Sequence, residues 1–319
     1  MAISPLTGSS NISLLENIKV QKIIENWQDT FQIDITEELG GYAEIQKYQC
    51  NQTQLKFFFP QDIAGSEKLY QQLQQFDWYY MADKWEYEVA ISDLLDCNSV
   101  LEIGSGSGAF VKRGSGIGLN IRGIETNTAA VRIAQHNNIA VEKLDLKEAA
   151  KVYSNSMDAV CSFQVLEHLP DPKSFIELSL QILKANGKLI FAVPNANSFL
   201  KYKEYLLDLP PHHMSQWSQF TFKSLEQIFP LKLKKSLKEP LASCHVPDYI
   251  DSYSSYLRSI SPAMKLFFNH YTLPFYLKIL NSNLRKILTG QSLYVQFRKT
   301  DGMACLDEIG RSRVPPSNK

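Results

Sequence analysis

A short apolar stretch runs directly into a glycine-rich turn at residues 100–108, V-L-E-I-G-S-G-S-G. Glycines at this spacing let the backbone turn sharply and approach a ligand where a Cβ atom would clash. A strand followed by such a turn and then a helix begins a nucleotide-binding βαβ unit. The turn alone does not identify the ligand, because Gly104, Gly106 and Ala109 also satisfy the dinucleotide fingerprint G-x-G-x-x-G/A.

Downstream of this turn, short apolar segments alternate with helix-length segments, a pattern typical of a parallel sheet covered by helices. The predicted strands are 100–103, 121–125, 140–144, 159–163, 188–193, 231–237 and 293–297, and the predicted helices are 128–136, 147–153, 172–183 and 223–229. The helix after the turn is expected to be short, because three further glycines follow it. We therefore predict an α/β fold with a doubly wound, mostly parallel seven-stranded sheet.

Three segments flank or interrupt this pattern. Residues 1–95 are predicted to form an N-terminal helical and aromatic appendage, an acceptor or lid module with one short β-like stretch, and residues 96–300 the main domain. A helical insertion at 248–290 precedes the last strand; extra helices on the core, a lid, an oligomer interface or a membrane-surface helix would each fit it. Residues 301–319 are predicted to be a disordered tail.

Composition narrows the functional classes. Lys and Arg together number 33, and so do Asp and Glu, so the chain lacks the net positive charge typical of nucleic-acid binders. No apolar run approaches the roughly 20 residues that span a bilayer, and the five cysteines never form a C-x-x-C pair. We therefore expect a cytoplasmic protein with a small-molecule or sugar-type acceptor, no nucleic-acid partner, no transmembrane segment and no metal site; a homo-oligomer is possible.

Three acidic residues at predicted strand ends favour S-adenosylmethionine over a nicotinamide dinucleotide. Glu102 is placed to meet a cationic amino-acid group and would be unfavourable beside a pyrophosphate. Glu125, about 20 residues beyond the turn, is where an acidic side chain accepts hydrogen bonds from ribose hydroxyls. Asp145, between Leu144 and Leu146, can bond an adenine amino group.

Residues 99–193 resemble the class I S-adenosylmethionine-dependent methyltransferases strand by strand. The stretches F-Q-V-L-E-H-L-P-D at 163–171 and L-K-A-N-G-K-L-I-F-A-V-P-N at 183–195 are similar to the small-molecule and sugar-pathway branch. The resemblance implies a Rossmann-like methyltransferase fold with S-adenosyl-L-methionine as cofactor. It further implies that the cofactor is held by Glu102, Gly104, Ser105, Gly106, Gly108, Glu125, Thr126, Asp145, Leu146, Gln164, Val165 and His168.

Two adjacent histidines in the proline-containing stretch D-L-P-P-H-H-M-S-Q-W-S at 208–218 are the candidate catalytic residues. One imidazole can serve as general base for a hydroxyl acceptor. The stretch is similar to the histidine-bearing loop of sugar and small-molecule methyltransferases, which favours His213 over His212. The alternative is that both histidines shape the loop and that alignment of the substrates alone drives the reaction.

Aromatic residues before the first predicted strand offer a further cofactor contact. Tyr80 and Trp85 are placed where an aromatic face could cover a sulfonium cation, although Trp85 could equally pack a helix against the sheet.

The predicted function is methyl transfer to a hydroxyl or similar nucleophile of a sugar, glycoconjugate or small metabolite. A quinone or aromatic O-methyltransferase is the alternative within enzymes, and a catalytically inactive cofactor-binding regulatory partner is the alternative from another class. Methylation of nucleic-acid bases is disfavoured, because the end of the predicted fourth strand lacks the N/D-P-P-Y/F motif.

Overall fold

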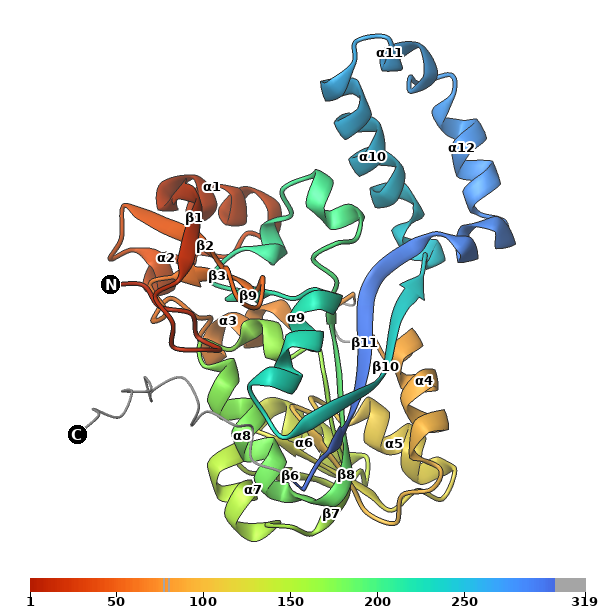
Figure 1. Ribbon diagram of the computed structural model, residues 1–319. Helices are drawn as coiled ribbons and strands as arrows, with labels where there is room; N and C mark the ends of the chain where they lie inside the picture. Colours follow the sequence, from red (N-terminus) through yellow and green to blue (C-terminus); the bar gives the residue numbers. More distant parts are fainter. Residues whose placement is uncertain (77, 80, 302–319) are drawn as a thin grey trace, which may run out of the picture.

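The structure, a computed structural model, describes residues 1–76, 78–79 and 81–301 and is built around a seven-stranded sheet (Figure 1). The strands follow the order β10-β11-β8-β7-β4-β5-β6. They are β4 (Val100–Ile103), β5 (Ile121–Glu125), β6 (Val141–Lys143), β7 (Met157–Phe163), β8 (Leu183–Pro194), β10 (Leu231–Pro240) and β11 (Thr289–Lys299). The five strands from β8 to β6 are parallel to one another, and β11 is antiparallel to both of its neighbours, β8 and β10. The predicted doubly wound, mostly parallel sheet is confirmed.

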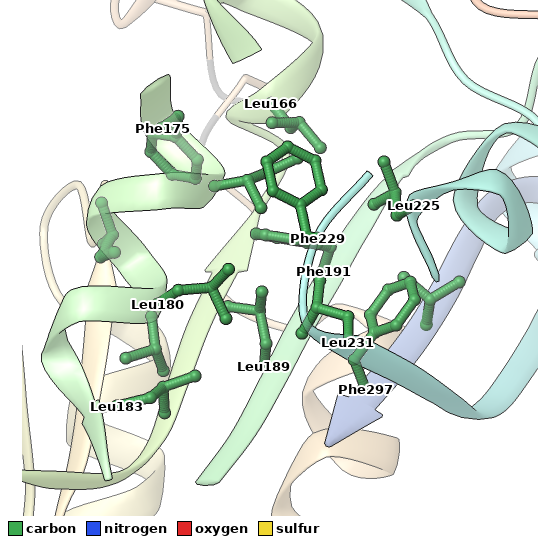
Figure 2. Close-up of a cluster of buried hydrophobic side chains, with 14 of the residues drawn as sticks. Leu166, Phe175, Leu180, Leu183, Leu189, Phe191, Leu225, Phe229, Leu231 and Phe297 are labelled. Atoms are coloured by element: carbon green, nitrogen blue, oxygen red, sulfur yellow. The ribbon is translucent and has the colours of Figure 1, made fainter. Parts of the chain in front are cut away.

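Helices cover both faces of this sheet. They are α4 (Trp85–Leu94), α5 (Ala109–Gly116), α6 (Thr128–His136), α7 (Leu146–Val152), α8 (Pro172–Ile182) and α9 (Gln219–Ser224). Side chains of α4, α5 and α6 share one buried cluster, and those of α7, α8 and α9 share another. Because successive side chains of a strand point to opposite faces, Leu189 and Phe191 of β8 enter the second cluster while Ile190 enters the first. Figure 2 shows side chains of α8 and β8 meeting in the second cluster.

Short polar side chains start the helices that follow the strands. Asn127 accepts hydrogen bonds from backbone N–H groups of α6, Asp145 from one of α7 and Asp171 from one of α8. Each carboxylate or amide oxygen satisfies a donor that a helix start would otherwise leave unpaired. Helix α5 is short, as expected from its glycines.

The N-terminal part contains a second sheet, so the expectation of only one short β-like stretch in the helical and aromatic appendage was wrong. Strands β1 (Ile12–Lys19), β2 (Glu44–Cys50), β3 (Lys56–Phe59) and β9 (Ser215–Gln216) form a four-stranded antiparallel sheet in that order, with α1 (Val20–Phe31), α2 (Thr36–Leu39) and α3 (Glu67–Leu73) around it. Strand β1 escaped detection because only Ile18 is buried in it, so it lacks apolar alternation. Strand β9 fixes the loop that carries His212 and His213 to this sheet.

Several predicted bounds differ from the structure, and two of these differences have a clear physical cause. The predicted helix over 172–183 ends at Ile182, and the strand predicted over 188–193 already begins at Leu183, because Leu183 pairs with Met157 of β7. The predicted helix over 223–229 is shifted toward the N-terminus, since α9 begins at Gln219 and continues into a 3₁₀ turn, η4 (Leu225–Gln227). Tertiary pairing and packing override local propensity at both places.

The predicted insertion is a helical hairpin between β10 and β11. It consists of η5 (Ser243–His245), α10 (Val246–Ile260), α11 (Met264–Phe267), α12 (Leu273–Leu280) and η6 (Asn283–Ile287), and it stands away from the two sheets (Figure 1). Among the described residues, no helix is long and apolar enough to cross a membrane.

Candidate active site

The glycine-rich turn links β4 to α5 through three left-handed backbone positions. Gly104, Gly106 and Gly108 have φ values of 72°, 53° and 83°. A Cβ atom added to Gly104 would lie 2.6 Å from Cγ2 of Val165. The turn therefore needs glycine both for its backbone conformation and for its close approach to the residue after β7.

Glu125, at the end of β5, holds the turn in place. Its Oε2 accepts a hydrogen bond from the Gly106 N–H at 2.9 Å, and its Oε1 accepts from the N–H groups of Thr126 and Asn127 at 2.7 and 2.8 Å. The Ser105 hydroxyl donates to the Ile124 carbonyl at 3.4 Å. A carboxylate oxygen has two lone pairs, so Oε2 of Glu125 retains capacity for a ligand hydroxyl.

Glu102, within β4, is an acid buried without a complete set of partners. Its side chain is 2% exposed, and its Oε2 has no hydrogen-bond partner among the described residues. Burial raises the pKa of this carboxyl well above its usual value, and the neighbouring charge of Lys84 opposes that effect. A cationic ligand group at this oxygen would compensate the buried negative charge.

The remaining cofactor candidates lie at the ends of neighbouring strands. Asp145 is exposed and caps α7, where its Oδ1 accepts from the Glu148 N–H at 2.9 Å. Gln164 adopts φ 57°, and its Nε2 donates to Glu86 at 3.0 Å. Trp85 lies edge-on to Tyr294 with ring centroids 6.5 Å apart.

Tyr80 lies outside the described residues. The cofactor role of each candidate, including Leu146, stays a prediction.

Three histidines form a cluster next to this edge of the sheet. His168, in the 3₁₀ turn η1 (Leu166–His168) after β7, lies with its ring centroid 4.6 Å from that of His212 and 4.9 Å from that of His213. His168 and His212 are 44 residues apart in the chain. Sequence reasoning assigned His168 to the cofactor, whereas the structure brings it against the two acceptor-loop histidines.

Each of the three imidazoles is oriented through Nδ1. Nδ1 of His168 lies 2.6 Å from the His212 carbonyl oxygen, and Nδ1 of His212 lies 2.8 Å from the Leu207 carbonyl oxygen. Nδ1 of His213 lies 3.1 Å from Oδ1 of Asp208. These oxygens can only accept, so Nδ1 is the donor in each neutral ring and Nε2 carries the lone pair. The hydroxyl of Tyr79 lies 3.1 Å from Nε2 of His212. Within the described part of the chain, no hydrogen bond engages Nε2 of His213.

Burial keeps the histidines that surround His213 neutral. Desolvation, with a smaller contribution from the charge of His213, lowers the pKa of His168 to about 3. Desolvation also lowers the pKa of His212 well below its usual value. A charged imidazole in this cluster is therefore costly unless a carboxylate compensates it, and Asp208 gives His213 such a partner.

Glu167, beside His168, is a buried acid that sequence reasoning passed over. Both of its carboxyl oxygens lack hydrogen-bond partners among the described residues, and Oε1 lies 3.8 Å from Nε2 of His168. Burial raises the pKa of this carboxyl to about 7. The E-H pair at 167–168 is visible in the sequence, but its burial depends on the loop at 208–218, which packs over it from elsewhere in the chain.

Replacing Glu167 by glutamine is expected to remove a pH-dependent loss of stability. The folded-state pKa of about 7 lies above the ordinary 4.5, so the folded protein retains a proton that the unfolded chain releases. The stabilisation is therefore present below pH 4.5 and is lost as the pH rises through 7, by about 3 kcal/mol at pH ~8. Denaturant unfolding of both proteins across this range measures it. A difference in unfolding free energy that does not change with pH would contradict the assignment.

A family model described as "Methyltransferase domain" matches residues 42–230. Ubiquinone biosynthesis O-methyltransferases from Alkalilimnicola ehrlichii and Hahella chejuensis are 30% and 29% identical over 40% and 38% of this chain. Those matches cover 56% of each relative, so the chain spans about half the length of the curated relatives that it matches. A solved SAM-dependent methyltransferase from Archaeoglobus fulgidus is 20% identical, with a TM-score of 0.42 over 67% of this chain and 94% of that one.

Proposed function

The chain belongs to the methyltransferase domain family, with a class I S-adenosylmethionine-dependent domain at residues 42–230, and from this premise we propose which methyl acceptor it uses and how. The acceptor is a hydroxyl, or a similar nucleophile, of a sugar, glycoconjugate or small metabolite. The dyad formed by His213 and Asp208 carries this proposal, because it is a buried base with an orienting carboxylate and a lone pair left at Nε2.

The residues at the glycine turn fit S-adenosylmethionine. When bound, the cofactor supplies a methyl group on a sulfonium, and a well-aligned nucleophile takes that methyl group as the carbon–sulfur bond breaks and S-adenosylhomocysteine leaves. The unpartnered oxygen of Glu102 suits its ammonium group, and the spare lone pair on Glu125 suits a ribose hydroxyl. Asp145 and Leu146 would border the adenine, as the family resemblance implies. A dinucleotide would instead bring its anionic pyrophosphate to this turn, which is unfavourable beside the buried Glu102 carboxyl group.

The protein's own contribution to the transfer is to orient the acceptor and remove its proton. An aliphatic hydroxyl is a weak nucleophile, so a base at hydrogen-bond distance speeds its attack. Nε2 of His213 takes the hydroxyl proton while the acceptor oxygen gains the methyl group. Asp208 stabilises the imidazolium that forms, in the manner of the carboxylate that orients histidine in hydrolase triads.

Burial of this dyad supports the proposal. His213 is 7% exposed, and the side chain of its partner Asp208 is 21% exposed. Water is thereby kept from competing with the acceptor, and the attraction between Asp208 and a protonated His213 is stronger than it would be at the surface.

A phenolic or quinone-type acceptor is the second candidate, and the names of the curated relatives favour it. A phenol ionises far more readily than an aliphatic hydroxyl, so it needs the base less. A catalytically inactive cofactor-binding partner remains the alternative from another class.

The cytoplasmic location of the protein also stays a prediction. The free thiols of Cys50, Cys97 and Cys161 support it.

An acceptor panel with isotopically labelled S-adenosylmethionine tests the proposal. We expect label transfer to pyranosides with free hydroxyls, together with formation of S-adenosylhomocysteine. Transfer only to catechols or hydroquinones would replace the sugar-type acceptor by the aromatic one. Tight cofactor binding without transfer to any acceptor in the panel would favour the inactive partner.

A further inference from the structure

The distal part of the hairpin between β10 and β11 is at least partly exposed at every residue. Its base is held by a small cluster in which Val246 and Ile250 of α10 pack on Phe199 and Leu241. From residue 255 to residue 289, by contrast, not one residue is buried. Figure 1 shows α11 at the far end of the hairpin, well clear of both sheets. Nothing in the described part of the chain covers this end.

Large apolar side chains gather on that exposed part. Five of them, at the end of α10, in α11, in the turn that follows it and at the start of α12, form what we call the apolar tip: Ile260, Leu266, Phe267, Tyr271 and Phe275, with exposed fractions of 61%, 76%, 56%, 81% and 62%. Isolated exposed apolar residues are ordinary, but a concentration of large ones on a projecting element marks an interaction site.

The charged Lys and Arg side chains of the hairpin around the apolar tip are not balanced by any acidic residue. Residues 252–288 contain five Lys and Arg residues and no Asp or Glu, although the whole chain has 33 of each kind. The five are Arg258, Lys265, Lys278, Arg285 and Lys286. None of them forms a salt bridge with another described residue, whereas Lys203, at the base, pairs with Asp251.

We propose that the apolar tip docks on the surface of a membrane that contains anionic lipid. Apolar side chains would enter the boundary between headgroups and acyl chains, and the neighbouring Lys and Arg residues would meet the lipid phosphates. The hairpin holds the tip away from the body, so the tip reaches a flat surface without a clash from the two sheets. This inference is independent of the proposed methyl acceptor.

Charge distinguishes a membrane from the other occupants of such a surface. A second copy of this chain would bring five uncompensated positive charges against five more, which disfavours self-association. Single-stranded RNA would use the basic residues and the aromatic rings, but it offers no burial for the aliphatic Ile260 and Leu266. An anionic lipid surface satisfies both the charges and the aliphatic side chains.

Co-sedimentation of the full chain with lipid vesicles tests the proposal. We expect binding to vesicles of phosphatidylglycerol and phosphatidylcholine to be at least about tenfold stronger than binding to phosphatidylcholine alone, and to weaken in high salt. Serine at Leu266, Phe267 and Phe275 together should lower binding to the anionic vesicles about tenfold or more. Glutamine at Lys265, Lys278 and Lys286 together should remove the preference for anionic lipid.

A matched control replaces three exposed apolar residues elsewhere, Leu95, Ile133 and Val152, by serine; this variant should bind vesicles like the wild type. Circular dichroism and calorimetric binding of S-adenosylmethionine should be unchanged in every variant, which separates docking from folding and from the proposed function. Equal binding to both vesicle types, or tip variants that bind like the wild type, would overturn the proposal. So would a dimer that the tip variant abolishes, or tighter binding to single-stranded RNA than to vesicles.

Discussion

Alanine at Gly104 is expected to weaken S-adenosylmethionine binding about 100-fold. The added Cβ atom would lie 2.6 Å from Cγ2 of Val165, in a backbone conformation with φ 72°. Valine is stiff about its first side-chain torsion, so either the turn or Val165 must move, and both belong to the proposed cofactor site. Strain of about 2 to 3 kcal/mol in the bound geometry corresponds to that loss of affinity. Calorimetric titration measures it.

Gly118 provides the matched control for this substitution. It also has a left-handed backbone, with φ 89°, but a Cβ atom added there meets nothing within 4 Å. Its alanine variant should therefore show a similar cost in stability with cofactor affinity within about twofold of the wild type. In the Gly104→Ala background, Val165→Ala should restore part of the lost affinity, because contacting residues are energetically coupled. An affinity for Gly104→Ala within threefold of the wild type would show that the close approach to Val165 is not needed.

The sheet and its glycine turn were predictable because their signals are local. Strands β4 and β5 and helix α6 have the bounds expected from apolar segments, glycine and capping residues that lie next to one another in the chain. The N-terminal sheet was not predictable from the sequence, because β1 has one buried side chain and β9 has only two residues. Pairing between β3 and β9 joins segments more than 150 residues apart, which no local pattern encodes.

The candidate site likewise has a part that the sequence predicts and a part that depends on the folded structure. The glycines and the three acids are identifiable from their place at strand ends, since parallel strands bring their carboxyl ends to one edge. The contact of His168 with His212 depends on how the loop at 208–218 folds back over η1, as does the burial of Glu167. Asp208 was part of the stretch considered in the sequence, yet its role as the partner of His213 required the loop conformation.

Alanine at His213 is expected to lower kcat by a factor of about 10² to 10⁴, the range that a positioned general base contributes. Affinity for S-adenosylmethionine should stay within about twofold, because the imidazole is oriented by Asp208 and not by the glycine turn. Steady-state rates, with calorimetric titration of the cofactor, measure both quantities.

Two other histidines make this test specific. Nε2 of His212 already meets the Tyr79 hydroxyl, so His212→Ala should reduce kcat much less than His213→Ala and act mainly through the loop. His136 is exposed on α6, and its alanine variant should behave like the wild type. If His213→Ala keeps kcat within about threefold, alignment of acceptor and cofactor drives the transfer without a base. An acceptor that ionises more readily, such as a phenol, would then become the better assignment, because its oxygen needs less help in losing its proton.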